Sequence, residues 1–600
     1  MSVEQLKKRS EIKPEDTWDL ESLYTSEALW EETFKQLQEE IPSIKTYEGR
    51  ILESSDTLLE LFQLQESFTL KLLHLHLYAN RHSDVDTKNS HYQGLVSRVD
   101  DLASRFYATT SFIEPEILAQ DDQIIEQYIR EDERLQVYRH AVEILLKQKP
   151  HILSLAEEAL LAKTSVLLMA SGSTFAILNN ADLKLPMIEN ETGQEVPLSH
   201  ARYSTFMEST NRQVRENAFK GMYSAYRQYR NTFASTLSTN IKKDNVVAEI
   251  RHHASARAHA LFNNHINESV YDALVTSVTS RVDLLHRYVS LRKKALGLDE
   301  IRMYDLYVPM VEEVDLAITY DEAKNMVIEA LSVLGEDYTN LLHKAFDERW
   351  IDPYENEGKR SGAYSSGAYG TKPFILLNWQ DTLDNVYTLA HELGHSLHTY
   401  YSTHNQPFVY SDYSIFLAEV ASTTNENLLT DYLLKKYEDP KVLAYIINHY
   451  LDGVKGTVYR QTQFAQFEHL IHQADQAGTP LTADYLSEEY AKLNRFYYGE
   501  EVVYDEEIEL EWARIPHFYY NYYVYQYATG FSAASALSHK ILTEKQPAID
   551  LYLDYLKTGS SDYPIEVLKK AGIDMSTPQA TLDALDLFEQ RLNELEELIK

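Results

Sequence analysis

Glycine and proline are scarce in this chain, and that scarcity limits the folds open to it. Only 19 Gly and 16 Pro occur in 600 residues, so few positions end a helix or force a turn. Over long stretches apolar residues recur every three or four positions, as they do between Leu58 and Leu64 and again between Leu582 and Leu595. That spacing is the period of an α-helix. The sequence therefore predicts a mostly α-helical fold.

Two segments interrupt the helical pattern. In LPMIENETGQEVPL (185–198), short apolar runs flank a polar Asn-Glu-Thr-Gly turn, which predicts a β-hairpin and a boundary. We therefore expect an N-terminal helical region, 1–198, and a larger region, 199–600. The second segment, GKRSGAYSSGAYGTKPFILLNW (358–379), is a Gly/Ser-rich loop followed by a short apolar run from Phe374 to Asn378. That run predicts a small β element.

Composition excludes several classes of function. The hydrophobic fraction of 44% is typical of a folded globular protein, and the formal charge of −36 makes nucleic acid and anionic membranes unfavourable partners. The absence of cysteine rules out thiol catalysis and fits a reducing compartment. The N-terminus lacks the apolar core of a signal peptide, and no run approaches the ~20 apolar residues of a membrane span. These features favour a cytoplasmic location.

The segment TLAHELGHSLHTYY (388–401) carries the strongest chemical signal. Asp381 or Thr382 can cap the start of a helix on which His391 and His395 lie four residues apart. Both imidazoles then project from one face and can bind one metal ion. Glu392 is adjacent in sequence and can take a proton from a metal-bound water without being a ligand itself. This pattern predicts a zinc hydrolase with one Zn²⁺ per chain.

A catalytic zinc site needs three protein ligands and one open position. The next strong helical segment, 411–437, contains Glu419 within an apolar stretch, where a carboxylate without a partner would be costly. We expect Glu419 to be the third ligand. Thr423 and Glu426 share its helix face, and His398 shares the face of His395, so all three are candidates for groups that orient the ligands. An ordinary solvated or buried polar role is an equal alternative for His398 and Glu426.

A tyrosine-rich segment, WARIPHFYYNYYVYQYATGF, follows at 512–531. Most of its rings are expected to belong to a hydrophobic core. A peptidase nevertheless needs donors for the oxyanion that develops in its transition state, and Tyr or His can serve. His517, Tyr519, Tyr522 and Tyr525 are the candidates.

These motifs together resemble a known family. HELGHSLH, with FLAEVAST placing its Glu 24 residues after the second histidine, is similar to the thimet-oligopeptidase (M3) family of zinc peptidases. GKRSGAY, PFILLNW, IPHFYYNYYVYQYATG and the opening WDLESLY resemble its oligoendopeptidase F branch. The resemblance runs over nearly the whole chain.

The resemblance implies a two-lobed helical bowl around a deep substrate channel, with zinc on its floor. It implies endopeptidase action on short unfolded oligopeptides, with 199–600 as the catalytic region. By analogy His391, His395 and Glu419 bind zinc and Glu392 is the general base. The strand near Phe374–Asn378 would pair with the substrate backbone, and a late histidine, matched by His517, and tyrosines would polarise the scissile carbonyl. Several registers fit the tyrosines, so Tyr519, Tyr522 and Tyr525 stay equivalent.

Two other interpretations remain open. One is a carboxypeptidase or dipeptidase on a related helical fold, which would need a cationic anchor for a substrate terminus; no single Arg or Lys identifies itself as that anchor. The other is a helical scaffold in which the histidine motif is accidental. Cleavage of a peptide blocked at both ends separates the first from an endopeptidase, and metal analysis tests the second.

Overall fold

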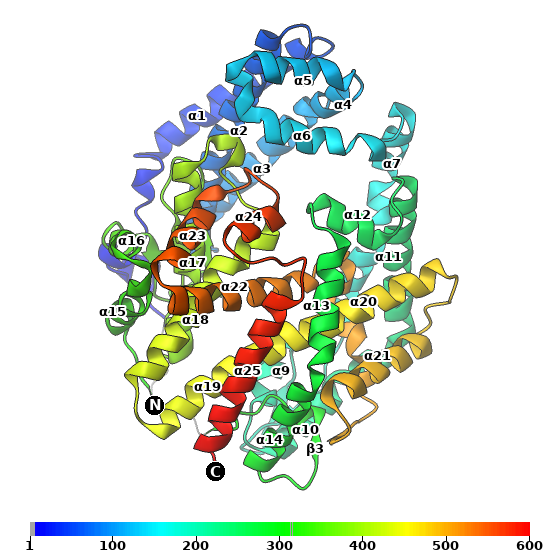
Figure 1. Ribbon diagram of the computed structural model, residues 1–600, viewed down its shortest axis with the longest axis vertical. Coiled ribbons are helices and arrows are strands. Elements are labelled where there is room, and N and C mark those ends of the chain that lie inside the picture. Colours follow the sequence, from blue (N-terminus) through cyan, green and yellow to red (C-terminus); the bar gives the residue numbers. More distant parts are fainter. Residues whose placement is uncertain (1–5, 312–313, 315) are drawn as a thin grey trace. The chain divides into compact units, whose positions relative to one another are not determined.

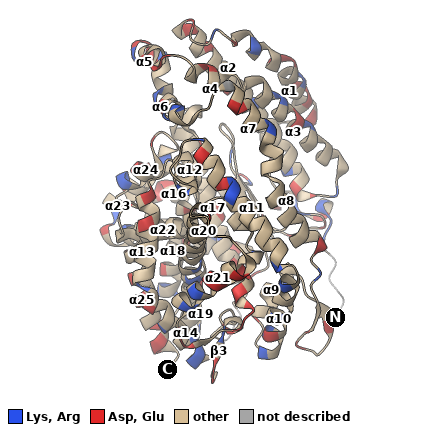
Figure 2. Cartoon of the chain, turned by 90° about the vertical axis from the view of Figure 1, so that its right-hand side faces the viewer, with Lys and Arg blue, Asp and Glu red and all other residues tan. Residues whose placement is uncertain are grey.

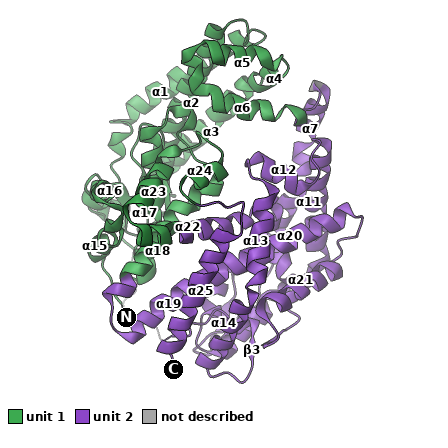
Figure 3. Cartoon of the chain, in the orientation of Figure 1, with its two compact units in different colours: residues 1–150, 316–432, 537–572 green, residues 151–315, 433–536, 573–600 purple. Residues whose placement is uncertain are grey.

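The computed structural model describes residues 6–311, 314 and 316–600, and most of them are helical (Figure 1). The predicted mostly α-helical class is confirmed. The chain forms two compact units (Figure 3). Unit 1 comprises residues 1–150, 316–432 and 537–572, and unit 2 comprises 151–315, 433–536 and 573–600. Each unit thus contains residues from both predicted regions, 1–198 and 199–600. The boundary between these two regions stays a prediction.

In chain order, unit 1 contains α1 (Glu27–Glu40), α2 (Ser55–Val85), α3 (Ser90–Thr110), α4 (Ile113–Leu118), α5 (Asp122–Glu131), α6 (Arg139–Lys147), α15 (Tyr320–Leu331), α16 (Glu336–Asp347), α17 (Leu383–Asn405), α23 (Gln546–Thr558) and α24 (Pro564–Lys570). A short 3₁₀ helix, Phe408–Tyr410, follows α17. Two further helices, α18 (Ile415–Lys436) and α22 (Tyr525–Glu544), have residues in both units.

Unit 2 contains α7 (Leu155–Leu168), α8 (Ala170–Ile177), α9 (His200–Met207), α10 (Arg212–Gln228), α11 (Arg230–Ile250), α12 (Ala256–Asn263), α13 (Glu268–Ser280), α14 (Val282–Ala295), α19 (Pro440–Val454), α20 (Arg460–Gln476), α21 (Ala483–Tyr498) and α25 (Gln579–Leu598). The predicted hairpin is present as β1 (Met187–Glu189) and β2 (Glu195–Pro197), which pair antiparallel. A second small sheet pairs β3 (Ile301–Arg302) with β7 (Val502–Val503).

A three-stranded sheet in unit 1 contains the predicted strand. Its order is β4 (Ile351–Asp352), β6 (Phe374–Leu376), β5 (Tyr364–Ser366), so β6 is the central strand. The prediction of a strand here is confirmed, but the expectation that it pairs with substrate is wrong. Both edges of β6 are already hydrogen-bonded, and its three residues are fully buried. Any substrate strand would have to add to an outer strand of this sheet.

Apart from the small cluster that contains Phe374 and Leu376 of this sheet, ordinary helix packing builds a large core in unit 1. In unit 1, α1, α2 and α3 surround Trp30, whose fully buried indole N–H donates to the Leu75 carbonyl at 3.0 Å. Acidic and basic residues are both distributed along the helices of the chain (Figure 2). Over the whole chain acidic residues outnumber basic ones, which gives the net charge of −36.

One apolar stretch in unit 2 departs from the expectation that no segment could span a membrane. Among the described residues, 156–182 is long and apolar enough by length and composition, and only 11% of its most apolar window is buried. Val166 and Leu167 are 78% and 74% exposed. Length and composition alone are weak evidence for a membrane location, because helices of soluble proteins can share both.

Candidate metal centre

Helix α17 places the two motif histidines in one row. The Thr382 hydroxyl accepts the Asn385 N–H at 3.3 Å, so Thr382, one of the two predicted caps, starts the helix. His391 and His395 follow one turn apart, as predicted, and their Nε2 atoms lie 3.1 Å from each other. Both side chains are largely buried, with 26% and 18% exposed. The helix therefore presents two nitrogen donors to one point.

Gly394 allows α18 to approach α17 closely enough to supply a third donor. A Cβ atom on Gly394 would lie 2.5 Å from Ser422 Cα and 2.9 Å from the Ala421 carbonyl oxygen. Such contacts are too short for any side chain, so only glycine fits this crossing. The Asn425 side chain donates to the Ala390 carbonyl at 3.0 Å and fixes the register of the two helices. Glu419 then lies one turn before the contact point.

The three donor atoms form a triangle of the size that zinc requires. Glu419 Oε2 lies 3.4 Å from His391 Nε2 and 3.5 Å from His395 Nε2. Bonds of about 2.0–2.1 Å in tetrahedral geometry put neighbouring ligand atoms about 3.3 Å apart. Among the described residues these three form the one group of His, Cys, Asp or Glu able to hold a metal ion. Their donor set of two nitrogens and one carboxylate oxygen also fits zinc.

Electrostatics at the cluster favour a positive charge. Burial disfavours the protonated His391 ring, but contact with the Glu426 carboxylate and the charges of Glu392 and Glu419 raise its pKa to about 9. Burial likewise opposes ionisation of Glu419, but the two histidines lower its pKa to about 2. A cation between these groups would satisfy the same attraction without protonating the rings.

Two side chains lie behind the ligands. His391 Nδ1 contacts Glu426 Oε1, which would hold the ring with Nε2 free to bind a metal. The Ser422 hydroxyl donates to Glu419 Oε2 at 3.3 Å. Glu426 had been singled out from its position on the helix face. Ser422 had not, although it lies three residues after Glu419, one turn along the same helix.

The Glu392 carboxylate is buried next to the cluster. Its side chain is only 7% exposed, and among the described residues its Oε2 has no hydrogen-bond partner. Burial raises its pKa, and the positive charge of His391 and His395 partly opposes this. A carboxylate with one oxygen unsatisfied, beside three metal-ligand atoms, is placed to exchange a proton with a small molecule bound there.

The other two candidates on these helices have different surroundings. His398 is 1% exposed, and its ring stacks on Tyr413 with 3.7 Å between centroids. Burial lowers its pKa to about 3, so the ring is neutral and packs in the core. Thr423 is buried as well, at 8% exposed. The hydroxyl that reaches Glu419 is that of Ser422.

The tyrosine-rich segment lies in unit 2 and divides into buried and accessible rings. Tyr522 is 2% exposed, and its hydroxyl lies 3.0 Å from His469 Nδ1; Tyr525 is fully buried. Tyr519 stacks on Phe175 at 4.3 Å, and its hydroxyl pairs with Thr236 at 2.8 Å. These three predicted tyrosines thus carry packing contacts.

His517, in contrast, is only half-buried and is surrounded by other tyrosines. Its Nε2 lies 3.4 Å from the Tyr527 hydroxyl, and its ring is 6.3 Å from that of Tyr523 and 5.7 Å from that of Tyr520. Asn521 has φ of +37° and Tyr522 of +56°. Non-glycine residues adopt such values at a cost, and they concentrate at functional sites. The sequence alone could not distinguish the accessible tyrosines from the buried ones, because most of this segment precedes α22 and does not follow a helical period.

Comparison with known proteins decides the family. The family model described as peptidase family M3 matches residues 205–587, and that of oligopeptidase F matches 116–184. This chain belongs to peptidase family M3. The match covers more than half of the chain, and it includes the helices that carry His391, Glu419 and His517.

Individual M3 relatives align over almost the full length. Oligopeptidase PepF of Bacillus subtilis is 51% identical over 99% of this chain and 89% of its own. The crystal structure of oligoendopeptidase-F from Enterococcus faecium is 46% identical, with a TM-score of 0.76 over 96% of this chain and 99% of its own. A peptidase structure from Chlamydophila abortus is 36% identical, with a TM-score of 0.93 over 99% and 100%. The predicted resemblance is confirmed, and the M3 chain is a metalloendopeptidase.

Proposed function

We propose that this M3 peptidase is a zinc-dependent oligoendopeptidase that hydrolyses internal bonds of short, unfolded peptides. The observation that supports it most directly is the triangle of donor atoms from His391, His395 and Glu419, with sides of 3.1, 3.4 and 3.5 Å. In this proposal the three residues hold one Zn²⁺. When bound, zinc supplies Lewis acidity that lowers the pKa of water and polarises a carbonyl.

The protein groups around the cluster perform the proton transfers. Glu392 takes a proton from the attacking water with its unsatisfied carboxylate oxygen and later delivers it to the leaving amine. Glu426 holds the His391 ring through Nδ1, and Ser422 holds one oxygen of Glu419. His398 and Thr423 remain candidates for a supporting role through packing, since both are buried.

The oxyanion donors remain part of the proposal. His517 is the first candidate, with Tyr519, Tyr522 and Tyr525 as predicted from the sequence. The accessibility of Tyr523 and Tyr527 around His517 favours these two over the buried Tyr522 and Tyr525, because a donor must be able to meet the substrate.

Substrate binding is proposed at β5, the outer strand that replaces β6 in this role. Tyr364, Ser365 and Ser366 are partly exposed, and β6 occupies only one edge of β5. The Ser365 hydroxyl lies 2.7 Å from that of Ser396 on α17, so β5 runs beside the helix of the metal ligands. A peptide added to β5 would gain backbone hydrogen bonds independent of its side chains. That recognition suits a peptidase with many substrates.

Metal analysis tests the proposal. The purified wild-type chain should contain about one zinc, and His391→Ala and His395→Ala should lose zinc and peptidase activity together. His404→Ala is the matched control, because His404 lies on the same helix, where it pairs with the Tyr400 carbonyl at 2.8 Å. Full zinc occupancy in either ligand variant would remove that residue from the site.

The proposal also includes a cytoplasmic location, which rests on the absence of cysteine from the sequence. Fractionation of cells that express the chain would check it. Recovery in the membrane fraction would instead direct attention to the apolar stretch 156–182.

A further inference from the structure

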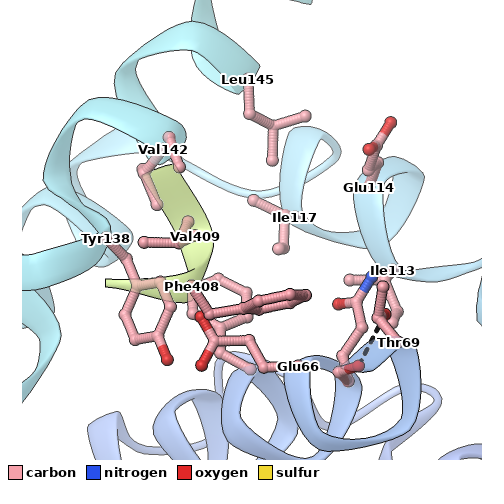
Figure 4. Close-up of a pocket in the computed structure, with 13 residues that line it drawn as sticks. Glu66, Thr69, Ile113, Glu114, Ile117, Tyr138, Val142, Leu145, Phe408 and Val409 are labelled. Carbon is pink, nitrogen blue, oxygen red and sulfur yellow. Dashed lines mark hydrogen bonds between the residues drawn. The ribbon is translucent and has the colours of Figure 1, made fainter. Parts of the chain in front are cut away.

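Unit 1 contains a pocket of about 270 Å³ that none of the proposed catalytic groups lines. It lies between α2, α4, α6 and the 3₁₀ helix Phe408–Tyr410 (Figure 4). Phe62, Ile117, Val142 and Phe408 supply apolar walls. Ile117 and Val142 are themselves buried, at 2% and 5% exposed. The pocket is thus a recess in the hydrophobic core that opens to solvent.

The walls are fixed by contacts outside the pocket. The Tyr410 hydroxyl accepts the backbone N–H groups of His140 and Ala141 at 3.1 and 3.2 Å, at the start of α6. This clamps the 3₁₀ helix against α6. On its other side the Phe408 ring meets the edge of Tyr369, with 5.6 Å between centroids. A pocket whose walls are held in this way is formed before any ligand arrives, which lowers the cost of binding.

A carboxylate lies in this apolar recess, and none of the described basic side chains forms an ion pair with it. Glu66 projects from α2 below the Phe408 ring, and Tyr138 lies beside it (Figure 4). Burial raises the pKa of Glu66, and the opposing influence comes from its hydrogen bond with Tyr138. Glu114 adds a second carboxylate at the rim, and none of the described residues that line the pocket is Lys, Arg or His. The pocket therefore attracts positive charge and offers none of its own.

Size restricts what can enter. A cavity of about 150 Å³ lined by apolar side chains holds one benzene molecule, whereas pockets for drug-sized ligands begin at about 300 Å³. A volume of 270 Å³ accordingly fits a single aromatic or branched aliphatic group with a short polar extension. A carboxylate on the ligand would be repelled by Glu66 and Glu114, so free amino acids are disfavoured.

We propose that this pocket binds a small primary amine, with its ammonium group on Glu66 and its apolar body between Ile117, Val142 and Phe408. The site is separate from peptide hydrolysis and does not depend on the proposed function of the metal centre. Its ligand class follows from one half-buried carboxylate, a second at the entrance and walls that are otherwise mostly apolar. A charged hydrogen bond in such surroundings is stronger than a neutral one.

Isothermal titration of the full-length chain with 2-phenylethylammonium tests the proposal. We expect one saturable site, and affinity at least about tenfold above that for 2-phenylethanol, the neutral ligand of the same shape. Phenylalanine should also bind at least about tenfold more weakly than the amine, because its carboxylate meets Glu66 and Glu114. Equal affinity for the amine and the alcohol would overturn the assignment of Glu66.

Three variants locate the binding. Glu66→Gln should lower the affinity for the amine by about tenfold or more. Glu114→Gln, at the exposed rim, should change that affinity by less than about threefold. Val142→Trp keeps both carboxylates but fills the recess, and it should abolish binding. Melting curves check that each variant is folded. If Glu66→Gln does not fold, the proposal is tested by Val142→Trp and by the comparison of the amine with the alcohol on the wild-type chain. Unchanged affinity in folded Glu66→Gln or Val142→Trp would place the amine elsewhere.

Discussion

The Glu392 side chain leads to the sharpest prediction at the level of single residues. It is buried and has one carboxylate oxygen without a partner among the described residues. Glu392→Gln keeps its size but cannot accept a proton, so turnover should fall by several orders of magnitude while zinc content stays near one per chain. Turnover with a defined peptide and metal analysis of the same sample measure both. Retention of a tenth of wild-type turnover would contradict the role of Glu392 as the base.

Local spacing explains which site residues the sequence could predict. His391 and His395 lie on one helix, and their separation alone makes their nitrogens converge. Glu419 could be proposed because a carboxylate in an apolar stretch needs a partner. Ser422 lies three residues after Glu419 on the same helix, so local spacing could have identified it as well. Gly394 could not be identified, because its importance lies in how closely α17 and α18 cross, and no local pattern encodes that distance.

The crossing of α17 and α18 makes a prediction about whole helices. Gly394→Ala introduces a Cβ within 2.5 Å of Ser422 Cα, so the helices must separate. We expect a loss of about 1–3 kcal/mol in the free energy of unfolding, typical of an overpacked core. Glu419 should move away from the histidines, and zinc affinity and turnover should fall too. Thermal melting and zinc titration measure the two effects.

Gly453 provides the matched control for that substitution. It lies in α19, and a Cβ there would meet nothing within 4 Å. Gly453→Ala should therefore raise stability by up to about 1 kcal/mol through helix propensity, with zinc affinity unchanged. If both alanine variants behave alike, close helix contact is not what Gly394 provides.

The segment from His517 to Tyr527, which leads from the loop after α21 into the first turn of α22, offers a test of the oxyanion donors. Tyr→Phe removes only a hydroxyl. If that hydroxyl donates to the oxyanion, the variant should lose about 2.7–4 kcal/mol of transition-state stabilisation, while its melting temperature stays unchanged. We expect this pattern at Tyr523 or Tyr527, and for His517→Ala. Tyr519→Phe, Tyr522→Phe and Tyr525→Phe should mainly reduce stability, by about 1 kcal/mol each. Normal turnover in all six variants would reduce this loop to a packing role.

The same loop makes a prediction about pH. The Glu468 carboxyl on α20 is fully buried and accepts the Tyr522 N–H at 2.7 Å. Burial, opposed by that hydrogen bond, raises its pKa to about 8 from an ordinary value of 4.5. Between these pH values the folded chain holds a proton that the unfolded chain has lost. Raising the pH therefore lowers stability, by roughly 1.4 kcal/mol per pH unit at most.

Glu468→Gln removes this titration and should flatten the decline. Melting temperatures at pH 5.5 and 7.5 test it, because other titrating groups contribute equally to both proteins and cancel in the comparison. The wild type should lose more stability over this interval than the variant. Parallel declines would show that Glu468 titrates outside the interval.

Strand β6 shows what local patterns leave open for a whole element. Its apolar run between Pro373 and Asn378 was sufficient to predict a strand, and the strand is present as Phe374–Leu376. The pattern could not place it within the sheet, because a buried central strand and an edge strand covered by a helix have similar composition. Its central position becomes visible only with β4 and β5, the latter ten residues upstream in a Gly/Ser-rich loop.

For the molecule as a whole, the sequence could predict the helical class and the family but not the division of the chain. Helical periodicity and the scarcity of Gly and Pro are visible in the sequence itself, so the helical class could be predicted from them. The two units instead interleave three segments each, an arrangement determined by long-range contacts. The metal cluster belongs to unit 1 and the His517 loop to unit 2.

The central claim, that this M3 chain is a metal-dependent endopeptidase for oligopeptides, is tested most directly with one peptide. A short unstructured peptide, acetylated at its N-terminus and amidated at its C-terminus, is incubated with the purified chain, and the products are identified by mass spectrometry. We predict cleavage at internal bonds, its loss with a zinc chelator and its return when zinc is restored. An uncut blocked peptide beside a digested unblocked one, or cleavage that persists after complete removal of zinc, would contradict the account.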